Sequence, residues 1–145
     1  MKNLYFTEVE NIKTNMKLFI IILNLSISLV LSSSQKVYFI NLKDGDTTTS
    51  PVFVQFGLSG KGVAPAGINL PNTGHHHLLI NVDEIDLSKP IPSSDKHIHF
   101  GGGQTEAFIN LPVGEHSLQL LLGDMAHRPH STPVISEKIN ITVTK

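Results

Sequence analysis

No cysteine occurs among the 145 residues, so the chain can form neither a disulfide framework nor a thiolate metal site. A blue-copper electron-transfer centre is therefore excluded, because that centre requires a cysteine ligand. Tryptophan is also absent, which weakens an interpretation based on stacking against carbohydrate rings. Arg128 is the one arginine and the formal net charge is −1, which argues against nucleic-acid binding by clustered basic side chains.

An apolar run over residues 18–31 follows the basic start Met16-Lys17 and ends in three serines. A basic start, a short apolar stretch and small residues are the three parts of a secretory signal peptide. The run contains one asparagine and two serines, whereas a permanent membrane anchor needs about 20 strongly apolar residues. We therefore predict a signal peptide over residues 16–34, and a periplasmic or secreted domain with no stable membrane span after cleavage. Retention of this segment as an N-terminal anchor is the alternative.

Residues 1–15 are polar and precede this segment, so we interpret them as an over-extended start. Residues 35–145 are enough for a single domain with its own core. They consist of short alternating runs separated by glycine, proline, asparagine, aspartate and serine, which is the pattern of an all-β fold. About seven short strands at near-regular spacing predict a single immunoglobulin-like β-sandwich. The expected strands are 37–42, 52–58, 76–82, 97–100, 106–111, 115–122 and 134–144.

Alternation within these strands predicts which side chains face the core, since successive residues of a strand point to opposite faces. The expected inward residues are Val52, Val54, Phe56, Leu58, Leu78, Ile80, Val82, Leu118, Leu120, Leu122, Ile135, Ile139, Ile141 and Val143. Outward positions in the last strand are Ser136, Lys138, Asn140 and Thr142. Residues 59–74 form a loop rich in glycine and proline, and so long a loop inside a compact domain is usually functional or disordered.

All eight histidines lie between residues 75 and 130, and four of them form two His-x-His pairs. A strand places the two members of such a pair on one face, about 6.5–7 Å apart at Cα. The neighbouring apolar residues have the opposite parity, so both pairs project away from the core. If the two strands are neighbours, four imidazoles converge, and zinc takes about four ligands while copper(II) accepts a flatter set of nitrogens. We predict a copper or zinc site at His75, His77, His97 and His99.

A second group of candidates surrounds these pairs and consists of His76, His127, His130 and Glu106. His76 has the parity of the core. His127 and His130 lie in an irregular loop, where they either add ligands, form a second site or are ordinary exposed imidazoles. Glu106 can orient a ligating ring through the second N–H of that ring, the usual arrangement around metal sites. We expect His116 to be a half-buried structural residue.

Five segments of the chain carry a family resemblance. They are NTGHHHLLI at 72–80, HFGGGQTE at 99–106, LPVGEHSLQLLLGD at 111–124, HRPH at 127–130 and GKGVAPAG at 60–67. Together they resemble a bacterial family of small exported domains known as domain of unknown function 4399. The resemblance implies a compact β-rich domain with no established activity, and its motif histidines are His75, His76, His77, His99, His116, His127 and His130. The family often carries aspartate where this chain has Asn81.

Three functions remain open on these observations. The first is an exported module that binds copper or zinc and releases the ion near pH 6, because an imidazole must be deprotonated to ligate. Copper stands higher in the affinity order for nitrogen ligands. The second is a non-enzymatic module that docks an envelope protein through the long loop and a polar histidine face with no bound metal. The third is a metal-dependent hydrolase or oxidase with Glu106 as the base. No catalytic triad spacing, phosphate loop or dinucleotide fingerprint occurs, so we favour a non-enzymatic domain.

Overall fold

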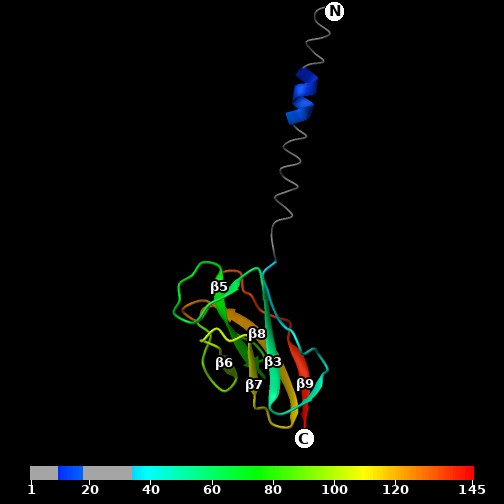
Figure 1. Ribbon diagram of the computed structural model, residues 1–145, viewed down its shortest axis with the longest axis vertical. Helices are drawn as coiled ribbons and strands as arrows, with labels where there is room; N and C mark the ends of the chain where they lie inside the picture. Colours follow the sequence, from blue (N-terminus) through cyan, green and yellow to red (C-terminus); the bar gives the residue numbers. More distant parts are fainter. Residues whose placement is uncertain (1–9, 18–33) are drawn as a thin grey trace, which may run out of the picture. The chain divides into compact units, whose positions relative to one another are not determined.

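The computed structural model describes residues 10–17 and 34–145, and the chain divides into the units Met1–Ser33 and Ser34–Lys145. Residues 10–17 are helical (Figure 1), with the Thr14 hydroxyl donating to the Glu10 carbonyl at 2.9 Å. Most of the proposed over-extended start and signal peptide, residues 1–9 and 18–33, lies outside the described residues. Among the described residues, no helix is both long enough and apolar enough to span a membrane.

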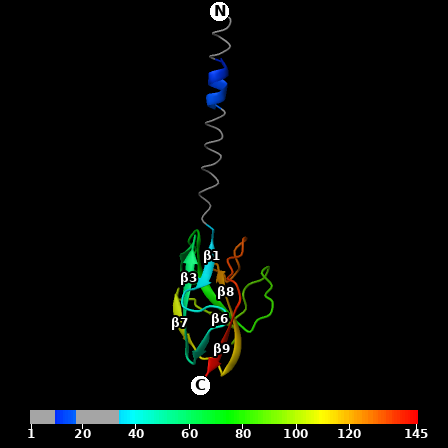
Figure 2. The same ribbon diagram turned by 90° about the vertical axis from the view of Figure 1, so that its right-hand side faces the viewer.

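Nine strands in two sheets form the second unit, and the sheets pack face to face as a sandwich (Figures 1 and 2), which confirms the all-β prediction. The strands are β1 (Lys36–Phe39), β2 (Thr47–Thr49), β3 (Val52–Ser59), β4 (Gly62–Val63), β5 (Thr73–Ile80), β6 (His97–His99), β7 (Glu106–Ile109), β8 (Gly114–Gly123) and β9 (Ile139–Thr144). One sheet has the order β1-β3-β7. The larger sheet has the order β2-β9-β8-β5-β4, and β6 pairs with β5 at the same edge as β4.

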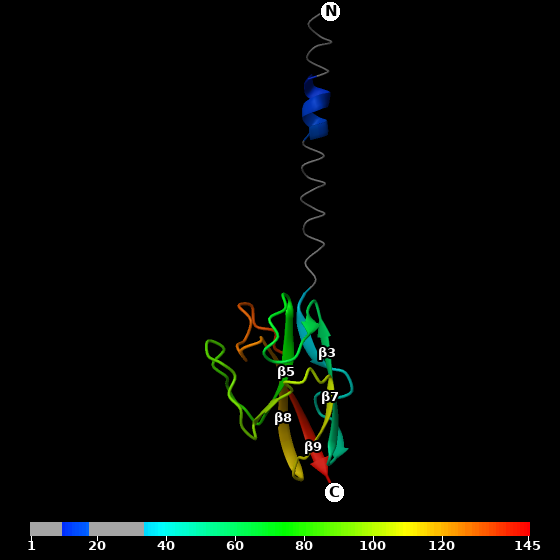
Figure 3. The same cartoon turned by 60° about the vertical axis from the view of Figure 1, so that its left-hand side comes forward.

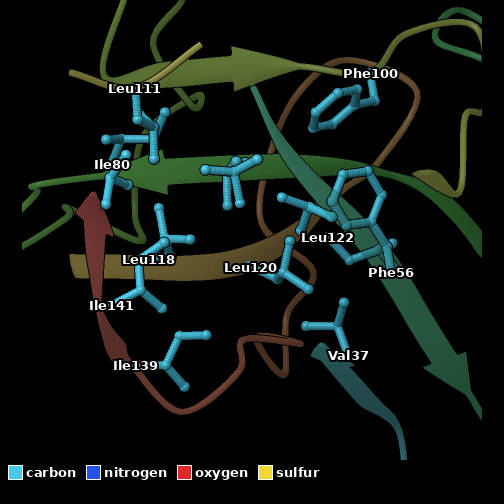
Figure 4. Close-up of a cluster of buried hydrophobic side chains, with 14 of the residues drawn as sticks. Val37, Phe56, Ile80, Phe100, Leu111, Leu118, Leu120, Leu122, Ile139 and Ile141 are labelled. Atoms are coloured by element: carbon cyan, nitrogen blue, oxygen red, sulfur yellow. The ribbon is translucent and has the colours of Figure 1, made fainter. Parts of the chain in front are cut away.

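The core between the sheets is built by the predicted alternation. Val52, Val54 and Phe56 of β3 are buried, and they meet Leu118 and Leu120 of β8, which are completely buried (Figure 4). Full burial of each such side chain stabilises the fold by about 1.5–3 kcal/mol. The strand parity of the sequence therefore specifies this layer of the molecule.

The predicted parity is wrong at residues 134–136. Val134 packs in the main core, Ile135 packs on the opposite face of the sheet, and Ser136 is buried. Because β9 begins only at Ile139, these residues are not part of a continuous strand. The Ser136 hydroxyl accepts from the Leu120 amide at 2.9 Å, which explains why a polar side chain is buried there.

Val82 also departs from its expected inward position, because β5 ends at Ile80 and Asn81 adopts a left-handed backbone with φ of 53°. Val82 packs instead on the outer face of the larger sheet, in an apolar group formed around Leu79, Ile91 and Leu121. The loops after β5 and β8 lie over this outer face (Figure 3). Both faces of β5 are consequently buried, from Gly74 to Ile80.

Candidate metal centre

Four histidines from two strands of the larger sheet and one loop converge on one point. His75 and His77 lie on β5, His99 lies on β6, and His127 lies in the loop after β8. One ring nitrogen from each residue lies within 4.8 Å of the corresponding nitrogen of every other. The pairing of β5 with β6 places His77 directly opposite His99. β5 and β6 are therefore neighbouring strands, which the metal prediction required.

The four rings surround a common volume. The centroid of the His75 ring lies 4.8 Å from that of His77, 4.9 Å from that of His99 and 5.0 Å from that of His127. The Nε2 atoms of His99 and His127 are 3.0 Å apart. In a tetrahedral zinc complex with bonds of 2.0–2.1 Å, neighbouring nitrogens are about 3.3 Å apart. Small side-chain movements are enough to bring this set to metal-binding distances.

Two glycines provide the space that the rings occupy. A Cβ atom built on Gly123 would lie 2.6 Å from Cε1 of His77, and one built on Gly101 would collide with the ring of His99. Neither glycine has a positive φ. Any larger residue at these positions would collide with a histidine ring. Glycine is therefore required here for space, and the backbone conformation would allow other residues. The histidine site depends on missing side chains as well as on the imidazoles themselves.

Burial sets the chemical state of the two clustered histidines on β5. His75 and His77 are 0% and 1% exposed, and neither nitrogen of either ring has a hydrogen-bond partner. A buried polar group without a partner costs about 1–3 kcal/mol. A metal ion would give one nitrogen of each ring a partner and offset part of that cost.

Burial, together with the neighbouring histidines, favours the neutral form of His75, His77 and His99. Burial lowers the pKa of His75 to about 4 and that of His77 to about 3, with the neighbouring histidines contributing to both shifts. The pKa of His99 is also lowered, first by burial and then by the charge of His127. Neutral imidazole is the form that binds a metal. These rings are therefore ready to act as ligands at neutral pH.

His127 reaches the cluster because the loop after β8 folds tightly on itself. The carboxylate of Asp124 accepts from the amides of Ala126 and Arg128, both at 2.8 Å. The amide of His127 donates to the Asp124 carbonyl at 3.0 Å, and its carbonyl accepts from Ile91 at 2.7 Å. His127 has a φ of 61°, a left-handed conformation that costs a non-glycine residue about 1–3 kcal/mol. The fold maintains this conformation at the position where a fourth imidazole completes the cluster.

His97 is the predicted ligand that the structure leaves out. It lies opposite Leu79, at the start of the apolar group on the outer face, whereas His99 lies opposite His77. The ring of His97 instead pairs through Nδ1 with the Ser94 hydroxyl at 2.8 Å. Strand spacing places His97 on the correct face but about 6.5–7 Å too far along the strand.

The remaining candidates lie in different surroundings. His76 is fully buried on the core side, 5.2 Å from the ring of Phe56, as its parity predicted. His130 has a buried Nε2 without a partner near Gly74, outside the group of four.

Glu106 lies on β7 of the other sheet and accepts from Gln55 at 3.1 Å, so it orients none of these imidazoles. His116 is buried and its Nε2 pairs with the Pro112 carbonyl at 2.8 Å, in keeping with a structural role.

An open cleft of about 230 Å³ adjoins the cluster. Three of the four converging histidines line it, together with apolar residues of the two outer loops. Its lining residues are His77, Pro90, Ile91, Pro92, Ser93, His99, Ala126 and His127. The cluster is therefore accessible to an ion from this side, although His75 and His77 are themselves buried.

Comparison with known proteins places the chain in a family. The chain belongs to the family described as Domain of unknown function (DUF4399), whose model matches residues 54–144. All four clustered histidines lie within the matched residues. The family resemblance read from the sequence is confirmed, and the family description assigns no activity.

No curated protein matches the chain. Among solved structures, the chain is similar to an endo-beta-1,4-mannanase from Thermotoga petrophila, with 18% sequence identity and a TM-score of 0.45. The match covers 77% of this chain and 20% of the mannanase chain. At that level of similarity the match carries no information about the function of the histidine cluster.

Proposed function

We propose that this domain binds one divalent transition-metal ion, copper(II) or zinc, through ring nitrogens of His75, His77, His99 and His127. The observation that supports the proposal most strongly is the convergence of four nitrogens within 4.8 Å, two of the rings being buried without any hydrogen-bond partner. Four imidazoles suit both ions, and the affinity order for nitrogen ligands favours copper.

The geometry fits the two ions in different ways. A tetrahedral zinc ion needs nitrogens about 3.3 Å apart, and a planar copper(II) ion needs about 2.9 Å between adjacent nitrogens. The 3.0 Å between the Nε2 atoms of His99 and His127 is close to both values. In the metal-free chain this same pair can share one hydrogen bond, with one ring as donor. Metal binding would replace that hydrogen bond by two coordinate bonds.

Protons compete less with a metal at the two buried histidines of the cluster than at an isolated imidazole. An isolated imidazole competes for protons near its ordinary pKa of 6.5, whereas burial lowers the pKa of His75 to about 4. Protons therefore compete with the metal well below pH 6 at the buried ligands. The site suits a role in holding or carrying an ion at neutral and mildly acidic pH.

Transport and storage outside the cytoplasm are part of the same proposal, and they rest on the signal-peptide pattern of residues 16–34. A catalytic role has less support. Glu106, the one candidate base among the predicted site residues, pairs with Gln55 on the other sheet. The position of Glu106 on the other sheet removes the base on which the catalytic hypothesis depended.

The experiment is calorimetric titration of the full chain, produced without a histidine tag, with copper(II) and with zinc. We expect one ion per chain with a dissociation constant below about 10 µM. Elemental analysis of the protein as purified gives the matching stoichiometry. Binding of neither ion in that range, or binding that persists when all four histidines are replaced by alanine, would contradict the proposal.

A further inference from the structure

The cleft beside the histidine cluster opens onto one side of the proposed ion. His77, His99 and His127 line the cleft, whereas His75 lies behind them and is fully buried. β5 and β8 close the opposite side, since buried Gly123 of β8 pairs with His75 and lies directly against the ring of His77. An ion held among the four rings is therefore covered on the sheet side and accessible on the cleft side.

The size of the cleft limits what can occupy it. Its volume is about 230 Å³, whereas one water molecule takes about 30 Å³ in the liquid. Pockets that hold drug-sized ligands measure about 300–1,000 Å³. The cleft fits a ligand of a few atoms together with water, and it is too small to enclose a sugar chain or a peptide.

The charge of the site selects the kind of ligand. Four neutral imidazoles leave the double positive charge of a bound ion uncompensated. No carboxylate lines the cleft, and its other walls are mostly apolar, from Pro90, Ile91, Pro92 and Ala126 with the small polar side chain of Ser93. Asp124 lies near His75, but one of its carboxylate oxygens already accepts two amides of its own loop. An ion beside apolar walls attracts a small anion more strongly than it would in water.

We propose that the metal ion of this domain keeps one coordination position open to the cleft and binds a small anion of a few atoms there. This inference rests on the proposed metal binding and goes beyond it, because a site for storage alone needs no open position. The ligand donates a lone pair to the ion and displaces water, and no bond in the ligand is broken.

The test uses the full chain loaded with copper(II) and titrated with azide. Calorimetry first establishes one copper per chain, and optical and electron paramagnetic resonance spectra then follow azide. We expect saturable spectral changes from a single azide per copper. Copper bound at one per chain with spectra unchanged by azide would overturn the inference and leave the metal proposal standing. Absence of bound copper would overturn the inference, and absence of bound zinc as well would overturn the metal proposal.

Variants of the cleft wall locate the anion. Ala126 is exposed and lines the cleft, so Ala126→Phe would fill the cleft without removing a ligand. We expect at least about tenfold weaker azide binding with the copper affinity unchanged. Ser93→Phe fills the cleft from its other wall and repeats the test if the first variant is unstable. Ser131→Phe is the matched control, since Ser131 is exposed and lies outside the cleft. Equal azide affinity in all three variants would contradict the position we assign.

Discussion

The two His-x-His pairs look equivalent in the sequence and have different surroundings in the structure. His75 and His77 lie on β5, a strand between two neighbours, and both rings are buried under the outer loops. His97 and His99 lie on the short strand β6, and only His99 joins the cluster. The difference shows that register against the neighbouring strand decides which imidazole becomes a candidate ligand, because spacing within a pair is the same in both.

The largest effect on metal affinity should distinguish His99 from His97, the two members of the second pair. We expect His99→Ala to weaken copper(II) or zinc binding at least about 100-fold, more than the loss of a group that only supports a ligand. His97→Ala should leave the affinity within about twofold of the original chain, because His97 contacts Ser94 and no member of the cluster. Calorimetric titration of the two variants measures the comparison. Equal losses in both would show that the proposed set of ligands is wrong.

Two adjacent glycines give a second matched pair. Gly101→Ala places a methyl group on the ring of His99, whereas Gly102→Ala meets only the flexible side chain of Gln104, at 3.1 Å. We expect Gly101→Ala to weaken metal binding about 10- to 100-fold by moving the His99 ring, with the control nearly unchanged. Competition with a metal indicator dye measures both affinities. A Gly101→Ala variant that binds as tightly as the control would show that the His99 ring can ligate from another position.

Asp124 can affect the metal site in two ways, by holding the loop that carries His127 and by the charge of its carboxylate. Asp124→Ala removes the acceptor of two loop amides, so we expect metal affinity to fall about tenfold as His127 loses its position. Asp124→Asn keeps an oxygen acceptor and removes the negative charge, and it should retain most of the affinity. If both variants lose affinity equally, the carboxylate acts on the ion through its charge, and the positioning role is wrong.

The inner layer of the molecule was predictable because buried apolar side chains alternate along most of β3 and along the first part of β8. The outer layer was not, because loops carry no period that shows what they cover. One sequence signal was present: Leu78, Leu79 and Ile80 are consecutive and apolar, as in strands that are buried on both faces. Interpreted in that way, the run predicts that other parts of the chain cover His75 and His77.

His127 shows why the candidate site was only partly predictable. Its ring joins the cluster through a left-handed residue in a loop, and no strand parity applies to such a position. His97 shows the opposite case, since its parity was correct and its partner on β5 is Leu79. Pairing register depends on contacts between distant segments, which periodicity within one segment does not contain.

The stability of the metal-free chain in acid should depend on the same buried rings. In the folded chain, burial is the main cause that lowers the pKa values of His75 and His76 to about 4 and that of His77 to about 3, from the ordinary value of 6.5. Below pH 6.5 these three histidines therefore bind protons in the unfolded chain that they do not bind in the folded chain. The stabilisation is fully present above pH 6.5, and the free energy of unfolding declines as the pH falls towards 4.

Urea denaturation of the metal-free chain over this pH range measures the decline. His76→Leu should make the decline shallower, because it removes one buried imidazole and leaves the four proposed ligands in place. His97→Ala is the control and should leave the slope unchanged. A free energy of unfolding that does not vary over this pH range would mean that these rings are not buried in neutral form.

X-ray absorption spectroscopy of the zinc-loaded full chain tests the central claim most directly, since it counts the ligands of the ion and identifies their type. We predict four imidazole nitrogens at about 2.0–2.1 Å in the original chain, with water in the position open to the cleft, and three imidazole nitrogens after His99→Ala. A spectrum dominated by oxygen ligands, or one that His99→Ala leaves unchanged, would contradict the account.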